Sequence, residues 1–168
     1  MLSTRTKFLG VTVALSALLA SQVLATTAKT PKILEWDTMV GVPGGLTGAQ
    51  SNGPLRGLNG GGVAWTLTSA KGELSTAGKL EIEVTGLVLA STLSNPAAAF
   101  RATVSCVNAN GSFSNVATTD TFPATTGPAA TGGGNSKIEA ILSLPTPCIA
   151  PIVFVTSTGG SWFAATGR

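Results

Sequence analysis

Two cysteines, Cys106 and Cys148, are the feature that most restricts how this chain can fold. Cys106 ends the stretch AFRATVSC, in which apolar and polar residues alternate as in a half-buried β-strand. Cys148 opens an apolar stretch that runs to Val155. The spacing is not that of a C-x-x-C redox pair. In an oxidising compartment the single possible intramolecular pairing is therefore a structural disulfide that ties two distant strands together.

The N-terminus predicts export to such a compartment. A basic start is followed by an uncharged apolar run from residue 8 to residue 20, and small residues at Val23 and Ala25 indicate cleavage after Ala25. A retained membrane anchor is the alternative, but the run is shorter than the ~20 residues that a bilayer-spanning helix needs. We therefore expect residues 1–25 to be a signal peptide and residues 26–168 to form one secreted domain.

The composition of the mature chain favours β-structure and excludes two classes of partner. Cleavage leaves eight basic and seven acidic residues, a net charge of +1, with no basic cluster. Binding to nucleic acid or to an anionic membrane needs such a cluster to neutralise phosphates, so we expect neither. The whole chain has only 10% charged residues and contains 21 glycines. Few charges disfavour solvent-exposed helices and favour short strands joined by glycine-rich loops.

Eight short segments have strand patterns, and no helical period or internal repeat is present. These segments are 33–38, 63–69, 79–90, 99–106, 112–119, 137–144, 151–157 and 161–167. Glycine-rich loops are expected at 41–62 and at 120–135. The number and spacing of the segments predict an all-β, single-domain β-sandwich, immunoglobulin-like or jelly-roll, with a β-barrel as the alternative.

The segment 79–90 has the clearest strand pattern. Its alternation places aliphatic side chains on the core face, and it places Glu81 and Glu83 on the solvent face. A bulge is predicted at Gly86, because the residues beyond it are apolar on both faces. Residues 70–73 are expected to form the turn that precedes this strand.

Candidates for catalysis are few. The chain has no histidine and no tyrosine, which removes the commonest general base and the commonest zinc ligand. Glu81 and Glu83 would lie about 7 Å apart on one strand face, a separation seen between glycosidase carboxylates, so a hydrolase is one hypothesis. The favoured interpretation is a solvated strand face, because two equivalent carboxylates lack the different environments that acid–base catalysis needs. We expect no catalytic residue, no metal ion and no cofactor.

Two neighbouring aromatic residues give a second hypothesis for function. Trp162 and Phe163 would point to opposite faces of an extended strand, so one of them could be exposed and bind a sugar ring. Burial of both rings is the competing and favoured interpretation. Arg56, in the first glycine-rich loop, is a further candidate for ligand binding.

Several segments together resemble a known group of proteins. FRATVSC, FPATTGPA, PCIAPIVFVTS, the final WFAATG and the RGLNGGG stretch that begins at Arg56 are similar to segments of a family of small secreted bacterial proteins of unassigned function. The resemblance covers most of the mature chain. It implies an exported bacterial protein in which Cys106 and Cys148 are paired, and it brings no activity and no catalytic residue with it.

The sequence therefore predicts a secreted, non-catalytic β-sandwich. Such a protein would act outside the cell or in the cell envelope as a binding or structural module. Its expected partner is an unknown extracellular protein or glycan, and the loops at 41–62 and 120–135 are expected to make the contacts. A carbohydrate-binding module that uses Trp162 or Phe163 is the first alternative, and a hydrolase that uses Glu81 and Glu83 is the second.

Overall fold

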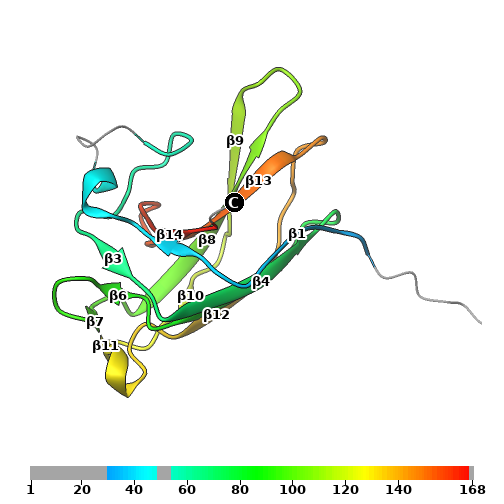
Figure 1. Cartoon of the computed structure of the whole chain (residues 1–168). Coiled ribbons are helices and arrows are strands. Elements are labelled where there is room, and N and C mark those ends of the chain that lie inside the picture. The colour runs from blue at the N-terminus through cyan, green and yellow to red at the C-terminus, as the bar shows by residue number, and fades with distance from the viewer. Residues whose placement is uncertain (1–29, 49–53, 167–168) are drawn as a thin grey trace, which may run out of the picture.

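The computed structural model describes residues 30–48 and 54–166, and within these ranges the chain forms β-strands and two short 3-10 helices (Figure 1). No helix in these ranges is long and apolar enough to cross a membrane. The expected signal peptide lies outside the described residues. The elements are β1 (Lys32–Trp36), β2 (Val40–Gly41), η1 (Gly44–Leu46), β3 (Trp65–Thr66), β4 (Ser69–Ser75), β5 (Lys79–Thr85), β6 (Val88–Leu89), β7 (Ser94–Asn95), β8 (Ala99–Val107), β9 (Phe113–Ala117), β10 (Phe122–Pro123), β11 (Gly127–Pro128), η2 (Ala129–Thr131), β12 (Ser136–Ile141), β13 (Ile149–Thr156) and β14 (Trp162–Ala165).

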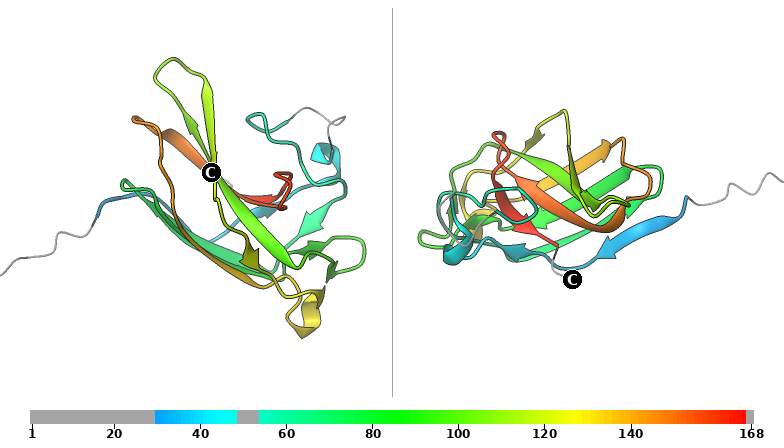
Figure 2. Two further views of the ribbon diagram at one scale, coloured as in Figure 1. Left: turned by 180° about the vertical axis from the view of Figure 1, so that it is seen from behind. Right: turned by 90° about the horizontal axis from the view of Figure 1, so that it is seen from above.

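The longer strands form two antiparallel sheets. One has four strands in the order β1-β4-β5-β12, and the other has six, in the order β10-β8-β13-β14-β2 with β9 also paired to β8. Two further sheets, β3–β6 and β7–β11, have two strands each. Figures 1 and 2 show the sheets as two layers that do not close into a barrel. The predicted all-β sandwich is confirmed.

The core lies between the inner faces of the two sheets and forms one cluster. The predicted alternation in β5 is confirmed, because its aliphatic side chains are buried while Glu83 is exposed. From the six-stranded sheet, Phe163 stacks on Trp65 at a centroid distance of 3.9 Å and meets the edge of Phe100 at 5.9 Å. The fully buried residues of the cluster include Leu74, Leu80, Ile82, Val84, Ile138, Phe100, Val104, Val153 and Val155.

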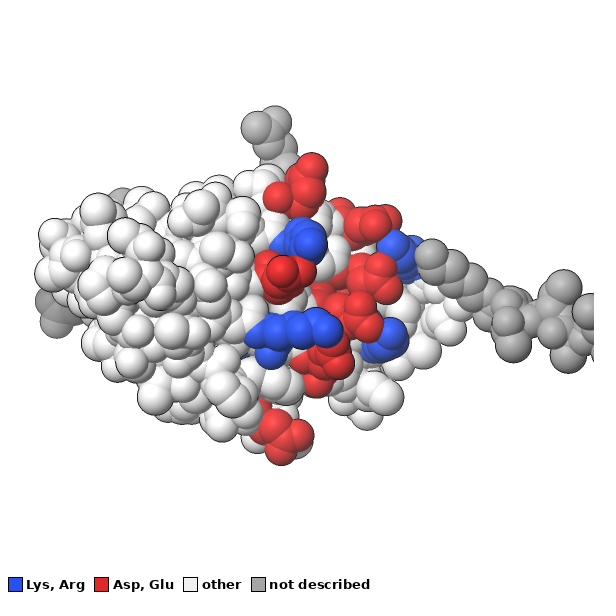
Figure 3. All heavy atoms as spheres, turned by 90° about the horizontal axis from the view of Figure 1, so that it is seen from below, with Lys and Arg blue, Asp and Glu red and all other residues white. Residues whose placement is uncertain are grey.

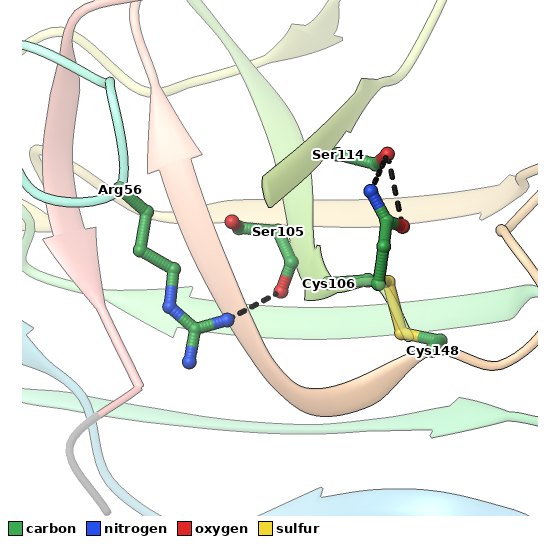
Figure 4. The surroundings of a disulfide bond; sticks show 6 residues. Arg56, Ser105, Cys106, Ser114 and Cys148 are labelled. Carbon is green, nitrogen blue, oxygen red and sulfur yellow. Dashed lines mark hydrogen bonds between the residues drawn. A yellow bond between two sulfur atoms is a disulfide. The ribbon is translucent and has the colours of Figure 1, made fainter. Parts of the chain in front are cut away.

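The predicted disulfide is confirmed. Cys106, near the end of β8, is bonded to Cys148, which immediately precedes β13, and their Cα atoms lie 4.8 Å apart (Figure 4). Strands β8 and β13 are also direct neighbours in the six-stranded sheet. The covalent bond therefore reinforces a pairing that the backbone hydrogen bonds already make.

The expected turn at 70–73 is wrong, because β4 runs through these residues. Lys71 and Glu73 face the solvent and alternate with Ala70 and Leu74, which are buried. Gly72, which suggested a turn, is instead a site of close packing. It pairs with Trp36 of β1, and a Cβ atom added to it would lie 2.4 Å from Cζ2 of that indole.

Strand β5 also ends earlier than expected. It stops at Thr85, and the predicted bulge at Gly86 is a break in the strand. Gly86 adopts φ +64°, a left-handed conformation that glycine tolerates best, and its N–H donates to Oδ1 of Asn135. The apolar residues beyond it form β6, which pairs with β3 in a separate ladder. A change of ladder explains why this stretch is apolar on both faces.

The two glycine-rich loops contain regular structure that their composition did not predict. The loop at 120–135 includes β10, β11 and η2. The loop at 41–62 includes the end of β2 and all of η1, and residues 49–53 within it lie outside the described ranges. Its second half is held against β14, because the N–H of Trp162 donates to the carbonyl of Asn59 and the N–H of Gly61 donates to the carbonyl of Trp162.

Replacing both cysteines with alanine should lower the free energy of unfolding by about 4 kcal/mol, because the bond closes a loop between residues 42 positions apart. Urea denaturation followed by tryptophan fluorescence measures the change. The oxidised and reduced forms of the unaltered chain provide the control, and the reduced form should behave like the double variant. Coincident transitions for all three would contradict this role of the bond.

Gly72→Ala should destabilise the fold by about 1–3 kcal/mol, because the added methyl group would overlap the Trp36 indole and the carbonyl oxygen of Glu81. Gly44→Ala is the matched control, since a Cβ atom there meets nothing within 4 Å. Thermal unfolding should separate the two variants clearly. Equal melting temperatures would show that the packing of the Trp36 indole tolerates a methyl group at position 72.

Candidate functional site

Charged side chains gather on the outer face of the four-stranded sheet. Figure 3 shows acidic and basic groups intermixed over this region, while much of the remaining visible surface is uncharged. We call this region the ionic face. It comprises the acidic residues Glu35, Glu73, Glu81, Glu83 and Glu139 and the basic residues Lys32, Lys71, Lys79 and Lys137.

Strand register aligns four glutamates across the sheet. Glu35 of β1 lies opposite Glu73 of β4, Glu73 lies opposite Glu81 of β5, and Glu81 lies opposite Glu139 of β12. Residues directly opposite one another in antiparallel strands are close neighbours, and like charges in such positions repel. The row therefore needs compensating positive charges on both sides.

Lysines provide that compensation. Nζ of Lys32 lies 2.8 Å from a carboxylate oxygen of Glu35 and 2.6 Å from one of Glu73. The other two members of the row have one lysine each, because Lys79 pairs with Glu81 and Lys137 pairs with Glu139. Beside the row, Nζ of Lys71 lies 2.9 Å from Glu83. The row next to the four glutamates alternates in sign, because Glu83 lies between Lys71 and Lys137.

These pairs change proton affinities in the direction that keeps the face ionised. The hydrogen bond from Lys137, then its positive charge, lowers the pKa of Glu139 below its ordinary value. The pKa of Lys32 is raised, first by its hydrogen bond to Glu35 and then by the one to Glu73. The pKa values of Lys79 and Lys137 are raised by their own glutamate partners. These shifts favour the charged forms of Glu139, Lys32, Lys79 and Lys137.

The ionic face offers a shallow hollow without a deep cleft. The hollow has a volume of about 250 Å³ and is lined by charged residues of all four strands together with Trp36 and Gly72. Glu81 and Glu83, the hydrolase candidates, lie at its surface with side chains 39% and 56% exposed. Each has its own lysine partner, so nothing in the geometry gives the two carboxylates the different environments of a general acid and a nucleophile.

The favoured interpretation, burial of both Trp162 and Phe163, is confirmed, and the alternative of one exposed ring is wrong. Trp162 is 3% exposed and Phe163 is 7% exposed. The two rings do point to opposite faces of β14, as the sequence indicated, but both faces are covered. Phe163 lies in the core between the sheets, and Trp162 packs against Phe154 at a centroid distance of 5.9 Å, where the stretch around Asn59 crosses it. Neither ring forms a platform for a sugar.

Arg56 is bound to the domain by several contacts. Its guanidinium donates to the carbonyl of Ser105 at 3.2 Å (Figure 4), and it lies 5.4 Å from the centroid of the Phe113 ring. Its own carbonyl accepts from Nδ2 of Asn115. Beside Ser105, β13 has a bulge that includes Pro151, which has no N–H to donate to the ladder. Arg56 supplies a donor at this irregular point of the sheet.

The described residues contain no group of three or more histidine, cysteine or acidic side chains placed to hold a metal ion. No family model, no curated protein and no solved structure matches the chain. The resemblance to small secreted bacterial proteins therefore stays a prediction.

Sequence reasoning found two members of the ionic face and missed the others. Glu81 and Glu83 were evident because they alternate within one strand. The short segments KGEL, KLEIE and KIEA all alternate charged residues with residues that face the core, and this shared pattern could have indicated three neighbouring strands with one charged face. Their register, which aligns the glutamates, depends on pairings that no local pattern contains.

Lys137→Gln should raise the pKa of Glu139 toward the usual value of about 4.3, because it removes the main group that stabilises the carboxylate. Since the folded-state pKa is the lower one, the stability that the pair contributes is present above the unfolded-state pKa and is lost as the pH falls through the folded-state value. An NMR titration of the Glu139 carboxyl measures the shift. Lys71→Gln removes the partner of Glu83 and should leave the pKa of Glu139 unchanged. An equal shift of that pKa in both variants would contradict the pairwise assignment.

Proposed function

We propose that the protein is an exported, non-catalytic binding module of the cell envelope or the extracellular space, and that the ionic face is its contact surface. The observation that carries this proposal is the segregation of charge. Five acidic and four basic side chains lie on one sheet face, in a chain whose mature part has only fifteen charged residues. The disulfide supports export, since such bonds persist in oxidising compartments.

The pattern of charge indicates the kind of partner. With four positive and five negative groups, the face has almost no net charge and does not suit a polyanion or a polycation. Its intermixed positive and negative groups suit an extracellular protein or glycan that itself carries both amino and carboxylate groups. Exposed ion pairs contribute little to stability individually, so exchanging a lysine–glutamate contact within the face for one with a partner costs the fold little.

Two features favour binding over catalysis. The carboxylates lie on an open face with lysine partners, and the hollow between them is shallow. The glycine-rich loops, which were expected to bind the partner, are instead engaged in the fold through the contacts of Arg56 and Asn59 and through β10 and β11. The sheet face remains as the candidate contact surface.

A pelleting assay with two insoluble polymers tests this proposal. Purified peptidoglycan carries amino and carboxylate groups, whereas cellulose carries neither. The protein should sediment with peptidoglycan at about 20 mM NaCl and be released at about 500 mM NaCl, where the screening length falls to a few ångströms. It should not sediment with cellulose under either condition.

Glu83→Lys should weaken this binding several-fold, because it replaces the acidic member between Lys71 and Lys137 and breaks the alternation of charge. Asp120→Lys is the matched control, since it changes the net charge by the same amount at an exposed position outside the ionic face. If the two variants bind alike, or if the unaltered protein binds neither polymer in a salt-dependent way, the ionic face is not the contact surface for this class of partner.

A further inference from the structure

Strand β9 forms an edge of the six-stranded sheet, in a hairpin with β8 that projects from the body of the sandwich (Figure 1). At the two ends of its pairing with β8, the N–H of Asn108 donates to the carbonyl of Ser112 and the N–H of Thr118 donates to the carbonyl of Ala102. Antiparallel ladders alternate, so the even-numbered residues of β9 bond to β8. The N–H and C=O groups of its odd-numbered residues therefore point outward.

These outward-pointing groups belong to Phe113, Asn115 and Ala117, and all three residues are exposed. Within residues 30–48 and 54–166, no backbone hydrogen bond outside the strand ladders involves these groups. Arg56 reaches Phe113 and Asn115 through their side chains, which lie on the outer face of the sheet. A row of three accessible donor–acceptor residues is a template for a further strand.

β9 also lacks the features by which the other edge strands resist pairing. β1 has a bulge and two charged residues, and β12 has Lys137 and Glu139. β2 is only two residues long, and β10 contains Pro123. In contrast, no charged residue and no proline occurs between Arg101 and Asp120. Charges, bulges, prolines and short length are the usual protections of a sheet edge.

We propose that β9 pairs with β9 of a second copy of this chain, in an antiparallel arrangement about a two-fold axis at Asn115. The outward residues are three in number and centred on Asn115, so a two-fold axis there places Phe113 opposite Ala117 of the second copy. Each residue of the three then exchanges two hydrogen bonds with its counterpart, and the two six-stranded sheets become one continuous sheet. No charged side chain of either β9 opposes another.

The side chains on the outer face favour the same occupant. Phe113 is 54% exposed, and it lies in register with Val107 of β8 and Ile149 of β13, the latter 47% exposed. This apolar row ends at the free edge with Phe113. A second copy would cover part of the ring with its Ala117, a small side chain that leaves room for it, and would remove exposed apolar surface from water.

Ala117→Pro tests the pairing without disturbing the hairpin. The N–H of Ala117 points away from β8, so proline removes a donor only from the free edge. The unaltered protein should form dimers as its concentration rises in sedimentation equilibrium. Ala117→Pro should remain monomeric, with the melting temperature that the unaltered protein has at concentrations where it is monomeric. Ala117→Ser keeps the N–H and should dimerise. A monomeric unaltered protein, or equal association of the proline and serine variants, would overturn the proposal.

Cysteine substitutions test the register independently. Opposite residues in a hydrogen-bonded pair have Cα atoms about 5.5 Å apart, within the range of a disulfide. Asn115→Cys should therefore crosslink with itself under mild oxidation. Phe113→Cys and Ala117→Cys should each crosslink poorly alone and readily when mixed. If Phe113→Cys crosslinks with itself as fast as Asn115→Cys does, the two-fold register is wrong.

Discussion

The pairing of β8 with β13 is the interaction on which the rest of the structure depends. β8 bonds to β13 along one edge and to β9 and β10 along the other, and its inner side chains line the core. The disulfide joins the end of β8 to the residue just before β13. Even Thr103 and Ser105, on the outer face of β8, are buried. A strand enclosed in this way has little tolerance for charge, and β8 has only one charged residue, Arg101, whose guanidinium donates to the carbonyl of Thr118.

Enclosure of β8 also explains where the charged residues of the chain can lie. On the outer face of the six-stranded sheet, the stretch from Pro54 to Gly62 bonds to β14 through Asn59 and Gly61 and to β8 through Arg56, and both Trp162 and Phe154 are buried. The four-stranded sheet has no such cover among the described residues, so its outer face meets the solvent and carries the ion pairs. The molecule thus has one sheet buried on much of both faces and one sheet that is polar on one face.

Much of the fold could be predicted from the sequence, because the strong patterns were local. Alternation in β5 and β8 placed their core residues correctly, and the cysteine pair could be assigned because only one pairing was possible. The turn at 70–73 was misjudged because Gly72 suggested flexibility, whereas the glycine is required by the indole of Trp36 across the pair. Whether a glycine forms a turn or packs within a strand depends here on contacts with another strand. The local sequence pattern of one strand does not contain that information.

The same distinction applies to the candidate site. Glu81 and Glu83 could be recognised as solvent-facing residues, but the row that joins Glu35 to Glu139 arises only when four strands take their register. Burial of Trp162 was the favoured interpretation, but the segment that covers it could not be predicted, because it is a glycine-rich stretch with no strand pattern. Backbone hydrogen bonds of Asn59 and Gly61 hold that stretch in place. Such bonds do not depend on the type of side chain, so the composition of the stretch does not predict them.

The strand order has a consequence for how the protein reaches this state. β12 pairs with β5, and β13 pairs with β8, so each sheet joins early strands to strands near the C-terminus. A chain that emerges with its N-terminus first cannot complete either sheet until its last strands have appeared. Distant pairings of this kind make folding slow. Until then one edge of β5 and one edge of β8 remain open, and a chaperone or a low local concentration during this interval would limit pairing with other chains.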